Sequence, residues 1–138
     1  MWLKRNPIGP EGCKPLANLL SINKTLVLLD LHNCGILDEG LIELSKANEC
    51  VLKHLYLDAN AITNVGAIHI SEWLKKHKNV IKTFYISINR IQDSGAIAIT
   101  NALKDSSSLR SLCLASNRLT DLALPVIVNN MLTMFISL

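Results

Sequence analysis

A motif of apolar residues followed by a polar anchor recurs along the whole chain. Four full copies run over 26–36, 52–62, 81–91 and 109–119, and a truncated copy opens the chain at 3–8. Each full copy has the pattern L-x-x-L-x-L, with the anchor three positions later. The anchors are Asn6, Cys34, Asn60, Asn89 and Asn117, spaced 28, 26, 29 and 28 residues apart. Because a fixed period of about 20–50 residues marks a stacked repeat architecture, this periodicity constrains the fold more than any local propensity.

Each copy predicts a strand, a turn and a helix. The last apolar residues of the motif alternate with polar ones, which is typical of a strand with one buried face. A small residue stands six positions past each anchor, and apolar residues then recur along one helix face. The repeat that begins at 26 is short and has Asn48 at its last core position, so we expect its helix to end early. One unit cannot bury both its strand and its helix, so neighbouring units must stack.

The chemistry of the recurring turn explains several residue types. An asparagine amide offers donors and acceptors to backbone groups that leave the strand ladder, and Cys34 can replace it with a weak S–H donor. A glycine six residues later lets a helix start lie close against the next turn. We expect Asp38, Asp93 and Asp121 in the first turns of helices, where the helix dipole favours a carboxylate.

These residues resemble leucine-rich repeats of the ribonuclease-inhibitor type, which carry N-x-I-x-x-x-G after the strand. The resemblance implies an α/β horseshoe solenoid, with a parallel sheet on the concave side and helices on the convex side. Strands joined through helices predict right-handed crossovers. We expect a single domain over 1–138. Its parts are a partial repeat 1–25 and the repeats 26–51, 52–80, 81–108 and 109–138.

The composition predicts contacts beyond the single domain. Hydrophobic residues make up 49% of the chain and charged residues only 18%, and neither end has a polar capping repeat. We therefore expect a segment of a longer repeat protein, or self-association through the uncapped ends. Residues 1–25 show no signal-peptide pattern, and no run of about 18 apolar residues predicts a membrane span.

The cysteines and the net charge argue against several kinds of site. Cys13, Cys34, Cys50 and Cys113 show no C-x-x-C spacing, so we expect reduced structural cysteines, no metal, and a reducing, cytoplasmic location. The net charge is +3, and its one dense cationic run is 75–78 at a predicted helix end. Nucleic-acid or membrane binding would call for a wider basic stripe, and neither is expected.

The repeat register places outward strand residues in columns on the concave side. The central column is Trp2, Asp30, Tyr56, Tyr85 and Cys113. One flanking column is Lys4, His32, Asp58, Ser87 and Ala115. The other flanking column is Leu28, His54, Thr83 and Ser111. Exposed Tyr and Trp together are typical of a binding hot spot. The predicted partner-binding residues are Trp2, Asp30, His32, His54, Tyr56, Asp58 and Tyr85. In contrast, Trp73 is expected to pack in the core, and His69 and His77 are expected on the convex surface.

Protein recognition is therefore the predicted function, without a cofactor and without catalysis. His32 with Asp58, and His54 with Asp30, come near one another in the register, but no nucleophile or oxyanion donor accompanies them. The resemblance leaves two alternatives open. One is a regulatory or sensor segment of a larger receptor or effector, as in NOD-like receptors. The other is a GTPase activator, as in the Ran-activating proteins, for which Arg5, Arg90 and Arg118 are candidate residues.

Overall fold

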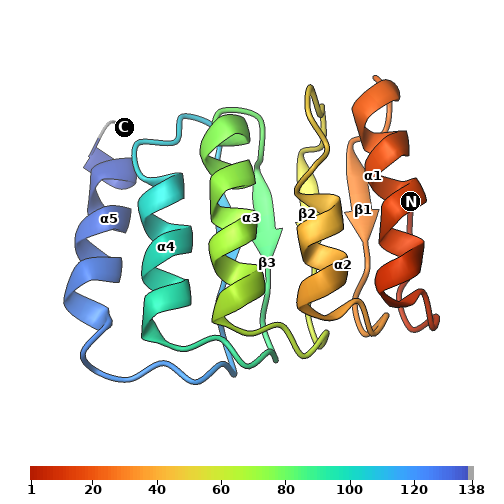
Figure 1. The fold of residues 1–138 in the computed structure, drawn as a ribbon. Coiled ribbons are helices and arrows are strands. Elements are labelled where there is room, and N and C mark those ends of the chain that lie inside the picture. Colours follow the sequence, from red (N-terminus) through yellow and green to blue (C-terminus); the bar gives the residue numbers. More distant parts are fainter. Residues whose placement is uncertain (137–138) are drawn as a thin grey trace.

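Five helices alternate with four short strands in the computed structural model, which describes the backbone of residues 1–136 and the side chains of residues 1–132 (Figure 1). The helices are α1 (Gly9–Ile22), α2 (Leu37–Leu44), α3 (Asn64–His77), α4 (Asp93–Leu103) and α5 (Leu124–Ile136). The strands are β1 (Leu28–Asp30), β2 (His54–Tyr56), β3 (Thr83–Tyr85) and β4 (Ser111–Cys113).

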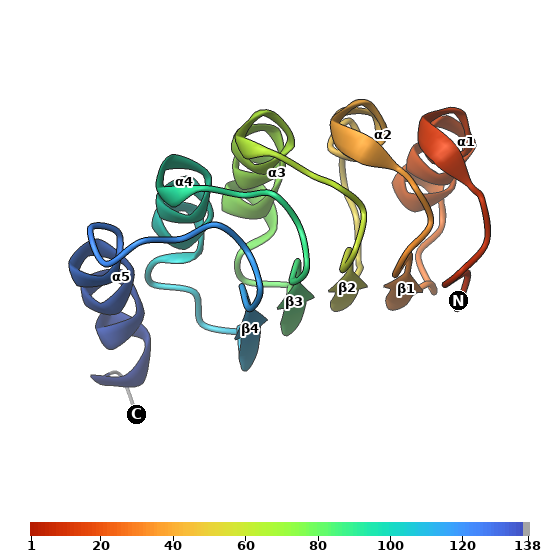
Figure 2. The ribbon, with the colours of Figure 1, turned by 90° about the horizontal axis from the view of Figure 1, so that it is seen from below.

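The strands form one parallel sheet in the order β1-β2-β3-β4, and Trp2 adds a single parallel bridge to Asp30. Leu55 pairs with Phe84, which pairs in turn with Leu112, as the repeat register predicts. Figure 2 shows the helices fanning out above the strands, so that the sheet lies on the inner side of the arc. The α/β solenoid predicted from the sequence is confirmed.

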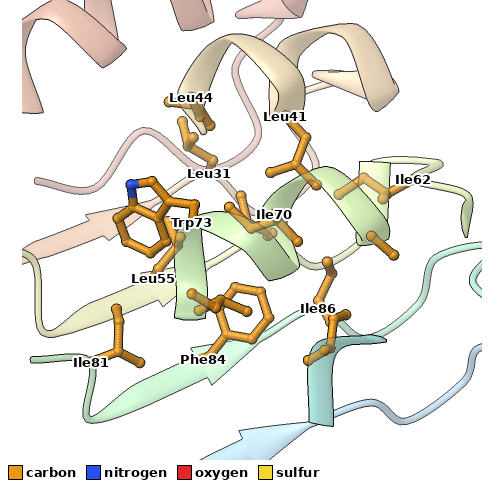
Figure 3. Close-up of a cluster of buried hydrophobic side chains, with 14 of the residues drawn as sticks. Leu31, Leu41, Leu44, Leu55, Ile62, Ile70, Trp73, Ile81, Phe84 and Ile86 are labelled. Atoms are coloured by element: carbon orange, nitrogen blue, oxygen red, sulfur yellow. The ribbon is translucent and has the colours of Figure 1, made fainter. Parts of the chain in front are cut away.

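The core lies between the sheet and the helix layer. Apolar residues of each strand and helix meet those of the neighbouring repeats, as Figure 3 shows for the cluster around Ile70 and Phe84. Burial of each such side chain contributes about 1.5–3 kcal/mol. Trp73 is 3% exposed and its indole N–H donates to the carbonyl of Ala47 over 2.8 Å, which confirms its packing role.

One histidine prediction is wrong. His77 is buried rather than on the convex surface, whereas His69 is exposed as expected. The imidazole of His77 stacks on the ring of Trp73 at a centroid distance of 4.3 Å. Its Nδ1 lies 2.8 Å from the carbonyl oxygen of Trp73, which accepts the bond. The last turn of α3 bends this side chain back over its own helix, which a helical-face pattern does not reveal.

The asparagine anchors bond each turn to the turn before it. Asn60 accepts from the amides of Cys34 and Ile36 over 3.0 and 3.3 Å, and donates to the carbonyl of Leu31 over 2.8 Å. Asn89 and Asn117 make equivalent bonds one and two repeats further on. Asn6 donates to Leu3 within the first turn, and the thiol of Cys34 donates to the same carbonyl over 3.2 Å. The anchors therefore hold neighbouring repeats together as well as closing their own turns.

A second set of polar side chains joins the helix starts of neighbouring repeats. Asp38 accepts from the amides of Thr63 and Gly66 over 2.8 and 3.1 Å, so it caps α3 in the following repeat. A Cβ on Gly66 would come within 2.5 Å of the Asp38 carboxylate, which explains the glycine. Asn64 and Asp93 make similar bonds to the next repeat. The expectation for Asp121 is wrong, because α5 begins only at Leu124 and Asp121 lies in the loop before it.

The helices and cysteines otherwise follow the sequence pattern. Helix α2 has 8 residues and is shorter than the other four helices, as the short repeat predicts. All four thiols are free; three are buried, and Cys113 is half-exposed on β4. The pKa of the Cys13 thiol is raised to about 12, mainly by burial and to a smaller extent by the nearby Cys34 and Glu43. The thiol therefore stays in the unreactive protonated form.

Candidate functional site

The concave face is the side of the sheet formed by outward strand residues and by the residues just beyond the strands. The pairs Asp30–Tyr56, Tyr56–Tyr85 and Tyr85–Cys113 make one continuous column. The register continues past the strands, because the amide of Asn33 donates to the carbonyl of Asp58 over 2.8 Å. The repeat period alone therefore positions this face.

Aromatic side chains lie in the central column of the concave face, the column that contains Asp30 and Cys113. Trp2 is 70% exposed, and Tyr56 and Tyr85 are half-buried. The two tyrosine rings meet edge to face, with centroids 5.3 Å apart and planes at 90°. The Tyr85 hydroxyl lies 2.9 Å from the hydroxyl of Ser111. The pKa of Tyr56 is raised, mainly by burial and to a smaller extent by the nearby Tyr85, Asp30 and Asp58. Its phenol therefore stays protonated and can donate a hydrogen bond.

The two aspartates were expected to be exposed, and this expectation is wrong. Asp30 is 8% exposed and Asp58 is 7% exposed. Asp30 accepts from the amide of His32 over 3.0 Å. Asp58 accepts from the amide of Ser87 over 2.7 Å and also from the Ser87 hydroxyl. These short carboxylates turn back to bind backbone N–H groups that the strand ends leave free.

The two histidine–aspartate pairs considered for catalysis are not formed. The Nδ1 of His54 lies 3.0 Å from the hydroxyl of Thr83, and no bond joins it to Asp30. His32 has no hydrogen bond to Asp58 among the described side chains, and one oxygen of the Asp58 carboxylate accepts from Ser87 instead. These two pairs therefore form no arrangement of nucleophile, base and orienting group with the described side chains.

A hollow of about 200 Å³ opens at the N-terminal end of the concave face. Its lining residues are Lys4, Arg5, Asp30, His32, Tyr56 and Asp58. It brings together four of the seven residues expected from the sequence. Of the other three, His54 lies at the start of β2, Tyr85 lies on the next strand, and Trp2 is not among the lining residues. Arg5 was not expected here. It stands one residue before the anchor Asn6 and has a φ of 61°. The residue types at the equivalent positions are Asn33, Ala59, Ile88 and Ser116, so no recurring residue type marked Arg5 in the sequence.

A second hollow, of about 330 Å³, lies at the edge where the strands end. Arg90 and Arg118 line it together with Thr63, Asn64 and Gln92. It lies outside the concave face. In the part of the chain that the structure describes, no group of three or more His, Cys, Asp or Glu residues is placed to hold a metal ion. Nor is any helix within 1–136 both long and apolar enough to cross a membrane.

Comparison with models of known protein families gives a match in the first half of the chain. Residues 23–45 match the family model described as Leucine Rich repeat. This segment contains β1 and α2, which together are the unit that the structure repeats along the sheet. No curated protein matches the chain. Domains of this family generally mediate protein–protein interaction and are typically not catalytic.

Proposed function

The chain is a leucine-rich repeat protein, and on that basis we propose that it is a non-catalytic recognition module that binds a protein partner through its concave face. One observation carries the proposal. The parallel register places Tyr56 and Tyr85 side by side on β2 and β3, and it places Trp2 in the same column, with Asp30 of β1 between Trp2 and Tyr56. Aromatic side chains of this kind supply most of the binding energy in many interfaces, because they bury large areas with few rotatable bonds.

The rigidity of the face supports this function. Its backbone is held by the parallel ladder, and the polar side chains below it are bonded within the sheet, as with Asp58 and Ser87. The tyrosine rings also fix one another by their edge-to-face contact. A surface that is already ordered loses little conformational entropy when a partner binds.

The test replaces the aromatic pair and compares it with a matched apolar pair on the helix layer. Partners are captured on the immobilised protein, identified by mass spectrometry and then titrated in purified form. We expect Tyr56→Ala with Tyr85→Ala to weaken the Kd at least tenfold, which corresponds to about 1.4 kcal/mol. The control is Val65→Ala with Ile68→Ala, which removes two exposed side chains of α3 and leaves the Kd unchanged. Loss of binding in the α3 control but not in the tyrosine variant would contradict the proposal.

GTPase activation is a second candidate, and the shared hollow of Arg90 and Arg118 favours it. An arginine placed against a transferring phosphoryl group accelerates GTP hydrolysis by roughly 10³–10⁵. GTP hydrolysis by purified small GTPases should then rise when the protein is added. Arg90→Ala and Arg118→Ala would each abolish that rise, whereas Tyr85→Ala would not. An unchanged hydrolysis rate with the wild-type protein would eliminate this candidate.

Self-association is a further proposal, supported by the apolar surface beside β4. Leu112, Leu114, Ile127 and Met131 line a hollow of about 400 Å³ there, and Leu124 and Val128 of α5 are more than half exposed. Such a surface is stabilised when another protein surface covers it. We expect sedimentation to show a dimer for the wild type and a monomer for Leu124→Lys with Val128→Lys. A wild-type monomer at high concentration would contradict it.

The same repeats would serve as a regulatory or sensor segment if they belong to a larger receptor or effector. The four free thiols support a reducing, cytoplasmic location. Fractionation of cells expressing the tagged protein tests the location, and recovery from an oxidising compartment would contradict it.

A further inference from the structure

A row of three exposed cations crosses the sheet where β2, β3 and β4 begin. The amide of Lys82 donates to the carbonyl of Lys53 over 2.7 Å, and the amide of Arg110 donates to the carbonyl of Lys82 over 2.8 Å. These bonds set the three residues opposite one another on strands about 4.8 Å apart. All three residues are exposed, and each directly precedes its strand. We call Lys53, Lys82 and Arg110 the cation row.

The cation row has no acidic partner among the side chains that the structure describes. Among the described residues, ion pairs join only Lys24 to Glu49 and Lys46 to Glu43. Among the described residues, the guanidinium of Arg110 donates to the backbone carbonyls of Ser107 and Leu109 in its own loop and to no carboxylate. Like charges facing one another across neighbouring strands repel, so the row is unfavourable in the isolated protein. An anionic partner would remove that repulsion.

The helix dipole, which explains the other cationic cluster, does not explain the row. Lys75 and Lys76 lie in the last turn of α3, where the negative end of the helix favours cations. The three residues of the cation row belong to no helix. Their alignment instead follows from the repeat, because each stands seven residues before its anchor.

The surroundings of the cation row indicate what kind of anion fits. The next column along the strands is His54, Thr83 and Ser111, all half-exposed and able to hydrogen-bond. Beyond it stand Tyr56 and Tyr85. The carboxylates of the concave face, Asp30 and Asp58, lie at or past the opposite strand ends and are buried. From the start of the strands toward their ends, the surface therefore presents cations, then polar groups and then aromatic rings.

We propose that the cation row binds an acidic peptide segment of the partner, which crosses β2 to β4 and sets an aromatic or apolar side chain against Tyr56 and Tyr85. The inference rests on the proposed function and names the partner class for that face. Aspartate and glutamate form charge-assisted hydrogen bonds with lysine and arginine, and complementary charge speeds the encounter. Single-stranded nucleic acid fits less well, because base stacking requires open ring faces and these two rings pack edge to face.

The experiment selects binders from a displayed library of random twelve-residue peptides, using the wild-type protein as bait. We expect the selected peptides to be enriched in Asp and Glu with at least one aromatic residue. Their Kd should weaken at least tenfold in Lys53→Gln with Lys82→Gln. It should change less than twofold in Lys75→Gln with Lys76→Gln, which removes the same charge from α3. Circular dichroism confirms that both variants remain folded.

Three results would overturn the inference. The first is selection of neutral or basic peptides. The second is equal weakening in the two lysine variants, which would reveal a general charge effect. The third is tighter binding of a single-stranded 20-mer oligonucleotide, or of phosphatidylserine vesicles, than of the selected peptides, with that binding lost in Lys53→Gln with Lys82→Gln.

Failure of this inference is distinguishable from failure of the recognition face. If the natural partner is lost in Tyr56→Ala with Tyr85→Ala but retained in Lys53→Gln with Lys82→Gln, the face stands and the acidic segment is wrong. If the tyrosine variant retains the partner and the α3 control loses it, the face itself is wrong.

Discussion

The repeat that contains β3 and the repeat that contains β4 follow the same sequence pattern but differ in burial. Phe84 of β3 is fully buried, whereas Leu112, its counterpart in β4, is half-exposed. Asn89 is 8% exposed, and Asn117 is exposed more than that. The difference arises because β3 is paired on both sides and β4 on one side in the described sheet. In such a stack, each repeat is stabilised largely by its neighbours.

The hydrogen bonds show the same contrast. Asn89 accepts from the amides of Asn60 and Ile62, whereas Asn117 accepts from that of Ile91 alone. Identical residue types therefore contribute differently according to their position in the stack.

The largest expected difference concerns the buried strand residues. Phe84→Ala should lower the free energy of unfolding by about 3–5 kcal/mol, because it leaves a cavity between sheet and helices. Leu112→Ala should cost about 1–2 kcal/mol, because its side chain is already partly exposed to solvent. Urea unfolding at constant m-value measures both. Equal losses would refute the view that neighbours determine the contribution.

The anchors should show a smaller difference in the same direction. Asn89→Leu leaves buried backbone groups of two turns without partners and should cost about 1–3 kcal/mol. Asn117→Leu should cost less, because water can reach part of its turn. Thermal unfolding of both variants, with Asn6→Leu as an exposed control, checks the order. A larger loss at Asn117 than at Asn89 would reverse the comparison.

A stabilising change is expected at the residue before an anchor. Ile88 has a φ of 54° and is 56% exposed, so a β-branched side chain occupies a left-handed conformation without compensating burial. Because left-handed backbone costs most residues about 1–2 kcal/mol and asparagine less, Ile88→Asn should stabilise the protein by about 1 kcal/mol. Ser116→Asn, at a φ of 54° in the next repeat, should give a smaller gain. Chemical unfolding measures both, and a loss of stability in Ile88→Asn would contradict the argument.

The smallest expected effect is a pH dependence between the last two repeats. The hydroxyl of Thr120, and then its backbone amide, hold the pKa of Asp93 below its ordinary value of 3.8. The stabilisation from this lowered pKa is present above pH 3.8 and is lost as the pH falls through the folded-state value. Thr120→Val should weaken this acid dependence in unfolding measured from pH 5 to pH 2. An identical pH profile in the variant would show that the contact contributes nothing.

Much of the fold could be predicted because the repeat fixes relative position without any knowledge of coordinates. Residues at the same distance from their anchors occupy equivalent positions on neighbouring strands. Tyr56 and Tyr85 each stand four residues before an anchor, so their pairing could be predicted from the sequence. The early end of α2 likewise followed from a short repeat.

The candidate site could be predicted only in part. Position in a column does not reveal where a flexible polar side chain turns, and Asp30 and Asp58 turned toward backbone amides. The recurrence of Lys or Arg seven residues before three anchors is visible in the sequence. Whether these cations form ion pairs depends on the positions of the carboxylates, which only the structure gives; among the described residues none is paired. The prediction that His77 is exposed failed for a similar reason, because its burial depends on contact with Trp73.

The sequence by itself determined that strands and helices alternate, which residues face the core, and which residues stand opposite one another on adjacent strands. These follow from a repeated pattern of apolar residues that must be buried. Only the tertiary structure decided which polar groups are satisfied inside the protein and which remain open to a partner. That outcome depends on the directions of individual hydrogen bonds between repeats, which a one-dimensional pattern does not contain.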